Sequence, residues 1–409
     1  MWDSDERSSF HVVLACGLMF AACAGGSRDR DAGSAGQSAP NVATGGGGDA
    51  AGQGGAGSAA IGVSAGANAG AGGSSAGSSG HVEAGGAGGR GGPAAPSGGA
   101  GASGAGGRAS AGAGTSGSSA APAGQKFVGN ITTSGQVRSD FSMYWDQITP
   151  ENEGKWGSVE ATRDQMNWSG LDRVHDYAMQ HGIPFKQHNF VWGSQQPSWL
   201  SGLSAADQKA QVEEWIRLFC ERYPDVALID VVNEPPPHTT PVYADALGGA
   251  GSSGYDWIVQ AFRWAHQYCP NAILILNDYN NIEYANDNSH FIDIVNRLKQ
   301  AGAPIDAIGA QAHDAYKLSN STVQGFLDGL TATGLPVYIS EYDIDLASDS
   351  DQQKIMQQQF PMFWNDEHVH GITLWGYVVG ATWKTNTGLL TSTGMKRPAL
   401  TWLMTYIGR

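Results

Sequence analysis

Short apolar runs alternate with amphipathic segments along the chain from residue 125 to its end. Runs rich in valine, isoleucine and leucine are typical of strands buried inside a parallel sheet. Eight such strands are predicted, at residues 127–131, 147–149, 184–188, 227–232, 272–276, 307–311, 337–340 and 371–375. Between most of them apolar residues recur at helical spacing, as Val212, Ile216 and Phe219 do, and Ser204 can cap that helix. Strands and helices that alternate over about 280 residues predict a single (β/α)8 TIM barrel, whose usual length is about 250 residues.

The alternative fold is an open, doubly wound α/β sheet. Such a sheet usually carries a glycine-rich phosphate-binding turn after its first strand. Residues 129–135 do not have that pattern. The barrel is therefore the preferred fold.

The segment 24–124 differs in composition from the rest of the chain. It is almost wholly glycine, alanine and serine, and it contains no aromatic residue. A segment of this kind cannot bury enough apolar surface to offset the entropy lost on ordering. We therefore predict a disordered linker at 24–124, acting as a tether, and one catalytic domain at 125–409. A fibrous glycine-rich structure is the weaker alternative, because no strict repeat is present.

Residues 1–23 have features of an export signal. The apolar run at 12–24 is too short to span a membrane as a helix, and it suits the hydrophobic part of a signal peptide. Its Ala-Ala-Cys ending resembles a bacterial lipoprotein processing site, which would make Cys23 the lipid-bearing residue. Acidic residues near the start of the chain depart from the usual basic pattern. The protein is expected to be exported, either secreted or anchored at the cell surface through Cys23.

Charge and cysteine content limit the possible partners and bonds. The formal net charge is −15, which argues against a nucleic-acid partner because phosphate binding needs basic side chains. Beyond the leader the chain has only Cys220 and Cys269, each late in a predicted helix. In an exported protein these residues could form a disulfide between neighbouring helices or remain two buried thiols. The sequence leaves that choice open.

Two of the predicted strands end in a glutamic acid. The strand at 227–232 leads into Asn233 and Glu234, and the three prolines that follow cannot continue a strand ladder. The strand at 337–340 leads into Glu341. One such glutamate alone would be interpreted as a solvated strand end. Two carboxylic acids at the C-terminal ends of strands in one sheet are the minimum needed to cleave a glycosidic bond.

The ends of the other predicted strands are rich in polar and aromatic residues. Tryptophan rings stack on the faces of sugars, while amide, imidazole, ammonium and carboxylate groups bind sugar hydroxyls. Such residues follow every one of the eight predicted strands except the first, which is followed by small polar residues. This mixture predicts a cleft for carbohydrate at the C-terminal end of the barrel.

Five short motifs then connect the chain to a known family. They are Thr-Pro-Glu-Asn-Glu-Gly-Lys-Trp at 149–156, Asp-Val-Val-Asn-Glu at 230–234, Leu-Asn-Asp-Tyr-Asn at 276–280, Gly-Ala-Gln-Ala-His at 309–313 and Ile-Ser-Glu-Tyr-Asp-Ile at 339–344. In this order they resemble glycoside hydrolase family 10, the endo-β-1,4-xylanases, from residue 125 to the C-terminus. The resemblance implies a retaining hydrolase that cleaves internal β-1,4 bonds of xylan by double displacement.

The resemblance implies a role for each catalytic residue. Glu234 would be the general acid and later the general base, and Glu341 would be the nucleophile. The two carboxyl groups of a retaining enzyme lie about 5–5.5 Å apart. His313, oriented by Asp343, would donate a hydrogen bond that keeps Glu341 ionised. Asn233 would bind the 2-hydroxyl of the sugar that is cleaved.

Behind these residues, Asp230 is expected either to support the site or to be a buried structural carboxylate. The same resemblance assigns the sugar-binding residues on the glycone side of the scissile bond. Glu151, Asn152 and Lys155 would hold the glycone. His188 and Trp192 would form the floor of the cleft.

The remaining binding residues would lie around the reacting centre and on the leaving-group side. Gln311 would lie close to the reacting centre, and Trp375 and Trp383 would form walls. Tyr279 and Gln195 would face the leaving group.

The resemblance implies no cofactor and no metal, and a monomer that binds xylan or xylo-oligosaccharides. His368 and His370 could bind a metal in principle, but they precede the last predicted strand, at the opposite end of the barrel from the predicted site. We interpret them as a solvated pair.

Three positions depart from the family pattern. The family commonly has His, Ala and Arg where this chain has Gly193, Pro235 and Lys384. None of these changes removes a catalytic group. They leave the binding of the leaving group and the exact xylan preference open.

Two other functions are compatible with parts of the pattern. Another retaining β-glycanase, such as a cellulase or a mannanase, would share the two glutamates, whereas the motif containing Lys155 resembles xylanases in particular. A non-catalytic carbohydrate-binding protein is expected to have replaced a catalytic carboxylate, and both Glu234 and Glu341 are present. The xylanase is therefore the preferred hypothesis.

Overall fold

The computed structural model describes residues 126–409. It contains one sheet of eight parallel strands, in the order β2-β1-β8-β7-β6-β5-β4-β3. The strands are β1 (Phe127–Ile131), β2 (Gln147–Thr149), β3 (Lys186–Trp192), β4 (Leu228–Asn233), β5 (Ile273–Asp278), β6 (Ala307–Ala310), β7 (Val337–Tyr342) and β8 (Val369–Leu374).

The two end strands of this order, β2 and β3, meet through a parallel bridge between Ile148 and Phe185. The Ile148 N–H also donates to the Pro184 carbonyl at 3.1 Å. The sheet is therefore nearly closed, and the predicted barrel of eight parallel strands is confirmed.

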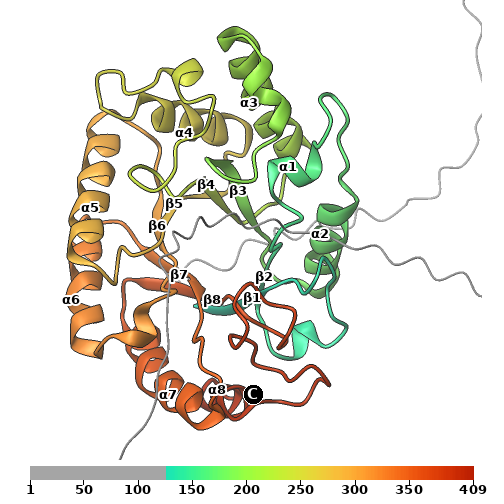
Figure 1. Ribbon diagram of the computed structural model, residues 1–409, viewed down its shortest axis with the longest axis vertical. Coiled ribbons are helices and arrows are strands. Elements are labelled where there is room, and N and C mark those ends of the chain that lie inside the picture. Colours follow the sequence, from blue (N-terminus) through green and yellow to red (C-terminus); the bar gives the residue numbers. More distant parts are fainter. Residues whose placement is uncertain (1–125) are drawn as a thin grey trace, which may run out of the picture. The chain divides into compact units, whose positions relative to one another are not determined.

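Helices form an outer ring around the strands (Figure 1). They are α1 (Trp156–Val159), α2 (Ser169–His181), α3 (Ala205–Arg222), α4 (Asp256–Tyr268), α5 (Ala285–Gln300), α6 (Asn320–Thr331), α7 (Asp349–Asn365) and α8 (Pro398–Tyr406). Short 3-10 turns lie at η1 (Phe141–Met143), η2 (Ser198–Gly202), η3 (Asp245–Leu247) and η4 (Ala315–Lys317). Serine hydroxyls cap the starts of α3, α6 and α7, as Ser204 was expected to do, because the first N–H groups of a helix have no partner within it.

Several strands extend further at their C-terminal ends than the apolar runs predict. Strand β3 continues to Trp192, which pairs with Asn233, and Asn233 pairs in turn with Asn277. Parallel pairing therefore carries the polar residues onto the sheet itself. Because these side chains project from strands and not from loops, their positions are set by the sheet.

The N-terminal end of the barrel is closed by an apolar cluster. Its members are among the first residues of their strands and include Phe127, Leu228, Ala307 and Tyr338. The Phe127 and Tyr338 rings stack with their centroids 5.9 Å apart. The opposite end, where polar residues end the strands, is left for the site.

Cys220 in α3 and Cys269 at the end of α4 form a disulfide, with their Cα atoms 5.3 Å apart. Both residues are buried. The structure thus decides between the two alternatives that the sequence left open, and it links two neighbouring helices of the ring.

Replacement of both cysteines by alanine is expected to lower the free energy of unfolding by about 2–4 kcal/mol, because the bond closes a long loop in the unfolded chain. The two residues are 49 positions apart. Thermal unfolding of the wild type and of Cys220→Ala/Cys269→Ala measures the effect, and reductant should lower the melting temperature of the wild type only. Equal melting temperatures for the two proteins would show that the disulfide contributes no stability.

The predicted leader at 1–23 and linker at 24–124 lie outside the described residues. Within residues 126–409, no helix combines the length and the apolar character needed to cross a membrane.

Candidate active site

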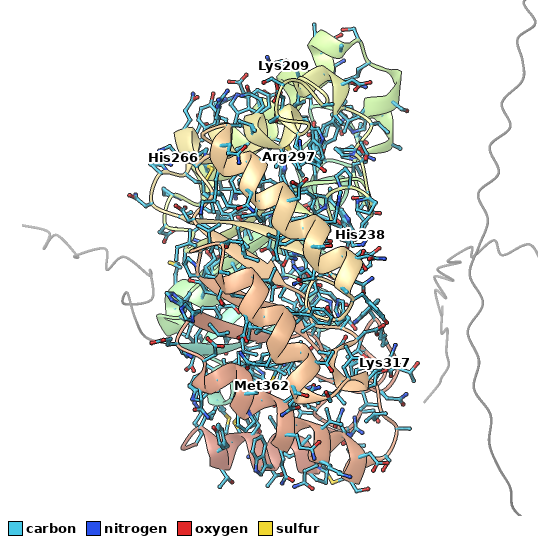
Figure 2. The ribbon with its side chains drawn as sticks, turned by 90° about the vertical axis from the view of Figure 1, so that its left-hand side faces the viewer. Lys209, His238, His266, Arg297, Lys317 and Met362 are labelled. Carbon is cyan, nitrogen blue, oxygen red and sulfur yellow. A yellow bond between two sulfur atoms is a disulfide. The ribbon has the colours of Figure 1, made fainter. Side chains whose placement is uncertain are left out.

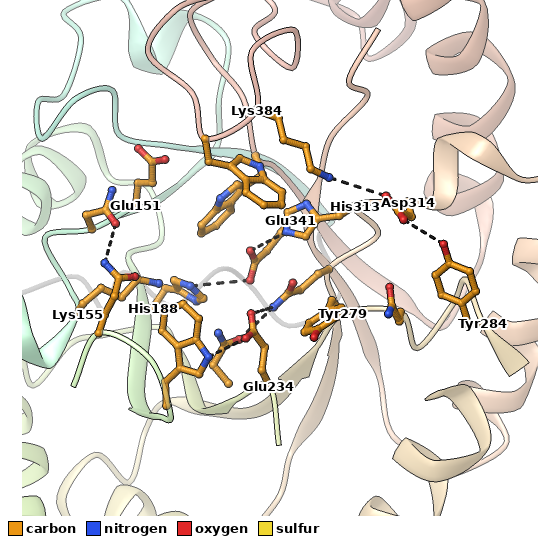
Figure 3. A pocket seen from close by; sticks show the side chains of 18 residues that line it. Glu151, Lys155, His188, Glu234, Tyr279, Tyr284, His313, Asp314, Glu341 and Lys384 are labelled. Atoms are coloured by element: carbon orange, nitrogen blue, oxygen red, sulfur yellow. Dashed lines mark hydrogen bonds and ion pairs between the residues drawn. The ribbon is translucent and has the colours of Figure 1, made fainter. Parts of the chain in front are cut away.

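A cleft of about 600 Å³ lies at the C-terminal ends of the strands (Figure 3). Its lining residues are Glu151, Asn152, Lys155, His188, Trp192, Gln195, Asn233, Glu234, Tyr279, Asn280, Tyr284, Gln311, His313, Asp314, Glu341, Trp375, Trp383 and Lys384. Every site residue predicted from the sequence is among them except Asp343, which lies behind His313. Side chains from residues 151 to 384 thus meet in one place.

The Glu341 carboxylate is buried and receives hydrogen bonds on both oxygens. His313 Nε2 lies 3.2 Å from Oε2, and the Asn277 amide donates to Oε1 at 2.8 Å. Burial would raise the pKa of Glu341, but the positive groups of His188, His313 and Lys155 outweigh it and hold the pKa at about 2. Glu341 is therefore ionised at neutral pH.

His313 is held between two carboxylates. Its Nδ1 lies 3.0 Å from Asp343, which also accepts a hydrogen bond from the Trp383 indole N–H at 2.7 Å. Burial lowers the pKa of His313, but the charges and hydrogen bonds of Asp343 and Glu341 raise it to about 9. Both ring nitrogens of the resulting imidazolium are donors, so His313 can serve both carboxylates at once.

Glu234 follows the last residue of β4 and has a left-handed backbone, with φ of 52°. The Glu234 N–H donates to the Asn277 carbonyl at 2.8 Å, and the Glu234 carbonyl accepts from the Thr239 N–H and hydroxyl at 3.1 and 2.7 Å. An uncommon conformation of this kind persists only where its surroundings determine it. These bonds direct the side chain into the cleft.

The Glu234 carboxyl group has a different environment from that of Glu341. It accepts hydrogen bonds from the Trp192 indole at 2.8 Å and from the Gln311 amide at 3.3 Å. Burial and the negative charge of Glu341 raise the pKa of Glu234, and they outweigh those hydrogen bonds. The pKa values of the two glutamates are thus shifted in opposite directions. The shift favours the ionised form of Glu341 and the protonated form of Glu234.

Asn277, at the C-terminal part of β5, connects the two glutamates and is a site residue that the sequence analysis did not single out. Its amide N–H groups donate to both Asn233 and Glu341 at 2.8 Å. Its own oxygen accepts the Ser340 hydroxyl at 2.5 Å, which fixes the orientation of the amide. The motif at 276–280 contained the signal, since Asn277 directly precedes the residues that face the cleft.

Asp230 supports the site from behind and is fully buried. One of its oxygens lies 2.8 Å from His188 Nδ1 and 2.9 Å from Lys186 Nζ. Burial and the charge of Lys155 lower the pKa of His188, while the charges of Glu341 and Asp230 oppose that shift. The Asp230 carboxylate favours a proton on Nδ1 and so fixes the orientation of the ring, with Nε2 facing the cleft at 3.9 Å from Glu341.

Lys155 and Glu151 lie together at one side of the cleft (Figure 3), and Asn152 also lines it. The Lys155 ammonium is 4.7 Å from the centre of the Trp192 ring, and burial lowers its pKa to about 8. The Gln195 amide donates to Asn152 at 3.2 Å. Gln195 therefore lies beside Asn152, a residue that the sequence analysis expected to hold the glycone, and its carbonyl accepts the Gly157 N–H of α1 at 2.9 Å. Its assignment to the leaving-group side stays a prediction.

Two tryptophan rings form part of the wall of the cleft. Trp375 packs against the His188 ring with centroids 5.0 Å apart, and Trp383 packs against His313 at 4.5 Å. Trp375 is buried, whereas half of the Trp383 surface is exposed. The Trp383 ring is thus the part of this wall that is open to a ligand.

Four lining residues were not predicted as site residues: Asn280, Tyr284, Asp314 and Lys384. The Tyr284 hydroxyl donates to Asp314 at 3.1 Å, and the Lys384 ammonium lies 3.9 Å from the same carboxylate. Asn280 belongs to the motif at 276–280 and Lys384 was recognised as a departure from the family. Tyr284 and Asp314 come from loops and carry no local signal.

The structure gives a physical reason for one of the three departures, Gly193, and a contact for a second, Lys384. A Cβ atom at Gly193 would lie only 2.6 Å from Thr239 Cβ, so the turn after Glu234 occupies the space of a side chain there. The Lys384 ammonium lies 4.3 Å from the centre of the Trp383 ring, a distance typical of a cation–π contact.

No group of three or more His, Cys, Asp or Glu side chains suited to a metal ion occurs in the described part of the chain.

Comparison with known proteins agrees with the geometry. The family model described as Glycosyl hydrolase family 10 matches residues 113–406. The chain is 52% identical over 282 residues to the endo-1,4-beta-xylanase B of Cellvibrio japonicus, a match that covers 68% of this chain and 45% of that protein. It is 29% identical over 280 residues to the endo-1,4-beta-xylanase A of Caldicellulosiruptor saccharolyticus, a match that covers 62% of this chain and 81% of that protein.

A solved structure of similar fold is xylanase 10B from Thermotoga petrophila RKU-1 in complex with xylobiose. The TM-score is 0.61 at 24% sequence identity, covering 69% of this chain and 94% of that one. The chain spans less than half the length of the Cellvibrio relative, so the match concerns one part of that protein.

Proposed function

Because the chain belongs to glycosyl hydrolase family 10, we propose that it is a retaining endo-β-1,4-xylanase that cleaves internal bonds of xylan. The observation that carries this proposal is the pair Glu234 and Glu341. The two side chains share the hydrogen-bond network of Asn277 and Gln311, yet their pKa values are shifted in opposite directions. One acid and one carboxylate in a shared cleft are what double displacement requires.

In the first step the ionised Glu341 attacks the anomeric carbon, while Glu234 donates its proton to the leaving oxygen. A bond forms between Glu341 and the sugar as the glycosidic bond breaks. Asn233 lies beside both acids, where its amide can bind the 2-hydroxyl of the same sugar. Its oxygen is occupied by Asn277 and Gln311, which leaves its N–H groups free for that contact.

In the second step Glu234 removes a proton from water, and the resulting nucleophile displaces Glu341 from the sugar. The change of role has an electrostatic cause. Once Glu341 is esterified, it no longer carries the charge that helps to raise the pKa of Glu234. The pKa of Glu234 then falls, and the same group becomes a base.

Xylan is proposed as the substrate because the named relatives are xylanases and the residues at 149–156 carry the xylanase-like motif. Lys155 and Glu151 lie where the glycone is expected. The ammonium group of Lys155 also interacts electrostatically with both Glu234 and Glu341. A cellulase or mannanase activity of the same pair of acids is the second candidate.

The test is an assay of the full chain on xylan, carboxymethyl cellulose and mannan, with release of reducing sugar as the measurement. We expect xylan to be cleaved best and the newly formed reducing end to have the β configuration in early NMR spectra. Cleavage of mannan or carboxymethyl cellulose in preference to xylan would overturn the proposed substrate. An α product would overturn retention.

The activity is expected to follow a bell-shaped pH profile. It requires ionised Glu341, whose pKa of about 2 sets the acidic limb, and protonated Glu234, whose raised pKa sets the basic limb. Trp192→Phe removes a hydrogen bond that favours ionised Glu234, so the basic limb should move to higher pH. Measurement of kcat/KM against pH with soluble xylo-oligosaccharides tests this shift. A basic limb that moves to lower pH would contradict the assignment of Glu234.

We also propose that the protein is exported. The support is the leader at 1–23, whose end resembles a lipoprotein processing site at Cys23. Labelling of the membrane fraction by a fatty-acid probe, lost in Cys23→Ala, is the expected result for a lipid anchor. A wild type without label would leave the secreted form as the alternative.

A further inference from the structure

We propose that His238 is a positioning residue that holds the ring of Tyr279 as a platform for the leaving-group sugar. The inference rests on the proposed function and extends it to a residue outside the cleft lining. Figure 3 shows Tyr279 on the side of Glu234 away from Lys155, and His238 is not among the residues that line the cleft.

The two rings form one stacked unit. Their centroids are 3.8 Å apart and their planes differ by 17°. The His238 side chain is only 10% exposed, whereas Tyr279 lines the cleft. His238 therefore supports one face of the phenol ring and leaves the cleft side of Tyr279 for a ligand.

Asp278, the last residue of β5, holds His238 and Tyr279 in place through hydrogen bonds. One oxygen of its buried carboxylate lies 2.7 Å from His238 Nδ1 and also accepts the Tyr279 N–H at 2.9 Å. His238 Nε2 lies 3.6 Å from Asp287, in the first turn of α5. Both nitrogens of the imidazole thus face carboxylates, so the ring has little freedom to turn.

Hydrogen bonds in the turn after Glu234 place His238 beside Tyr279. The His238 N–H donates to the Pro235 carbonyl at 3.1 Å, and the Thr239 N–H returns to the Glu234 carbonyl at 3.1 Å. His290 Nε2 lies 3.0 Å from the Pro236 carbonyl and connects the turn to α5. Figure 2 shows His238 near one end of that helix, at the edge of the molecule in this view.

This arrangement gives the proline run a function. Proline fixes φ and lacks an N–H, so residues 235–237 form a stiff connection between Glu234 and His238. The acid that protonates the leaving oxygen and the support of the Tyr279 ring therefore belong to one rigid turn. A leaving sugar stacked on Tyr279 would be held at a set position relative to the proton that it receives.

Charge strengthens the stack. Burial lowers the pKa of His238, but the hydrogen bond and charge of Asp278 and the charges of Asp287 and Glu234 outweigh it, so the pKa is raised. When His238 is protonated, its imidazolium against the face of the phenol ring adds a cation–π attraction to the ring contact.

The test uses the full chain with two substrates that share a glycone. When xylotetraose is cleaved at its central bond, the leaving group is xylobiose, which would contact Tyr279. When β-xylobiosyl fluoride is cleaved, the leaving group is fluoride, which occupies no sugar-binding position. We expect His238→Ala to lower kcat/KM for xylotetraose about tenfold and for the fluoride less than twofold, because only the former uses the platform.

Two further variants separate positioning from folding. His238→Gln keeps a donor for Asp278 but has no ring, and it should show the same substrate-dependent loss. His175 is the matched control, since it lies 2.8 Å from Asp225 and packs against Tyr223 away from the cleft. His175→Ala should leave both rates unchanged.

Equal losses on both substrates, or a folded His238→Gln with the wild-type rate on xylotetraose, would overturn the proposal. A wild type that cleaves neither substrate would instead overturn the proposed function.

Discussion

Replacement of Glu341 by alanine is expected to lower kcat on xylan by roughly 10⁴-fold or more, the range that loss of a covalent nucleophile costs other enzymes. The physical reason is that the neighbours of Glu341 hold its carboxylate in the ionised form, and alanine removes that nucleophile. Asn277, His313 and His188 all direct their polar atoms at Glu341 and not at the sugar. The substrate should still bind, so the loss should fall on kcat.

Chemical rescue distinguishes loss of the nucleophile from loss of the fold. In Glu341→Ala, azide can enter the vacated space and displace an activated aryl leaving group, which gives the α-glycosyl azide. Glu283→Gln is a matched control, because Glu283 is a buried glutamate outside the cleft lining, and its rate should stay near that of the wild type. Wild-type turnover by Glu341→Ala would exclude Glu341 as the nucleophile.

Replacement of Glu234 by alanine is expected to have the second largest effect, about 10²–10⁴-fold on xylan, the usual contribution of a general acid or base. The loss should depend on the leaving group. A sugar is a poor leaving group unless its oxygen is protonated, whereas an activated phenol leaves with little help from a general acid. With an aryl xylobioside the first step should therefore remain fast, and the glycosyl-enzyme should accumulate because no base activates water.

Pre-steady-state kinetics tests this prediction as a burst of released phenol followed by slow turnover. The basic limb of the pH profile should also disappear, since it reports the proton of Glu234. Azide should restore turnover with a β-configured product, opposite to the product of the Glu341 variant. A Glu234→Ala enzyme that loses activity equally on xylan and on the aryl substrate would contradict the role of general acid.

The contrast between the two glutamates illustrates how much of the site was predictable. Both were found from the sequence, because proline after Glu234 and the apolar run before Glu341 mark the ends of two strands. Their opposite protonation states depend on burial and on partners distant in the chain. Asn277 lies 64 positions from Glu341, and Trp192 lies 42 positions from Glu234. Only the pairing of the strands into one sheet brings these groups into contact.

Loop residues show the limit of the sequence more clearly. Gln195 belongs to a loop whose direction is not set by strand periodicity, and the structure turns it toward Asn152. His238 carries no pattern at all, because a lone histidine after three prolines could equally be solvated. Its role follows from a stack and a shared carboxylate that exist only in three dimensions.

The sequence by itself determined the barrel and most of the residues that line the cleft. Apolar runs define the eight strands, and in a parallel barrel the C-terminal ends of all strands must lie at the same end of the molecule. Tertiary structure alone decided the Cys220–Cys269 bond, the network through Asn277 and the support of Tyr279 by His238. Those features depend on distances between side chains and on burial, and both arise only when segments far apart in the chain are packed together.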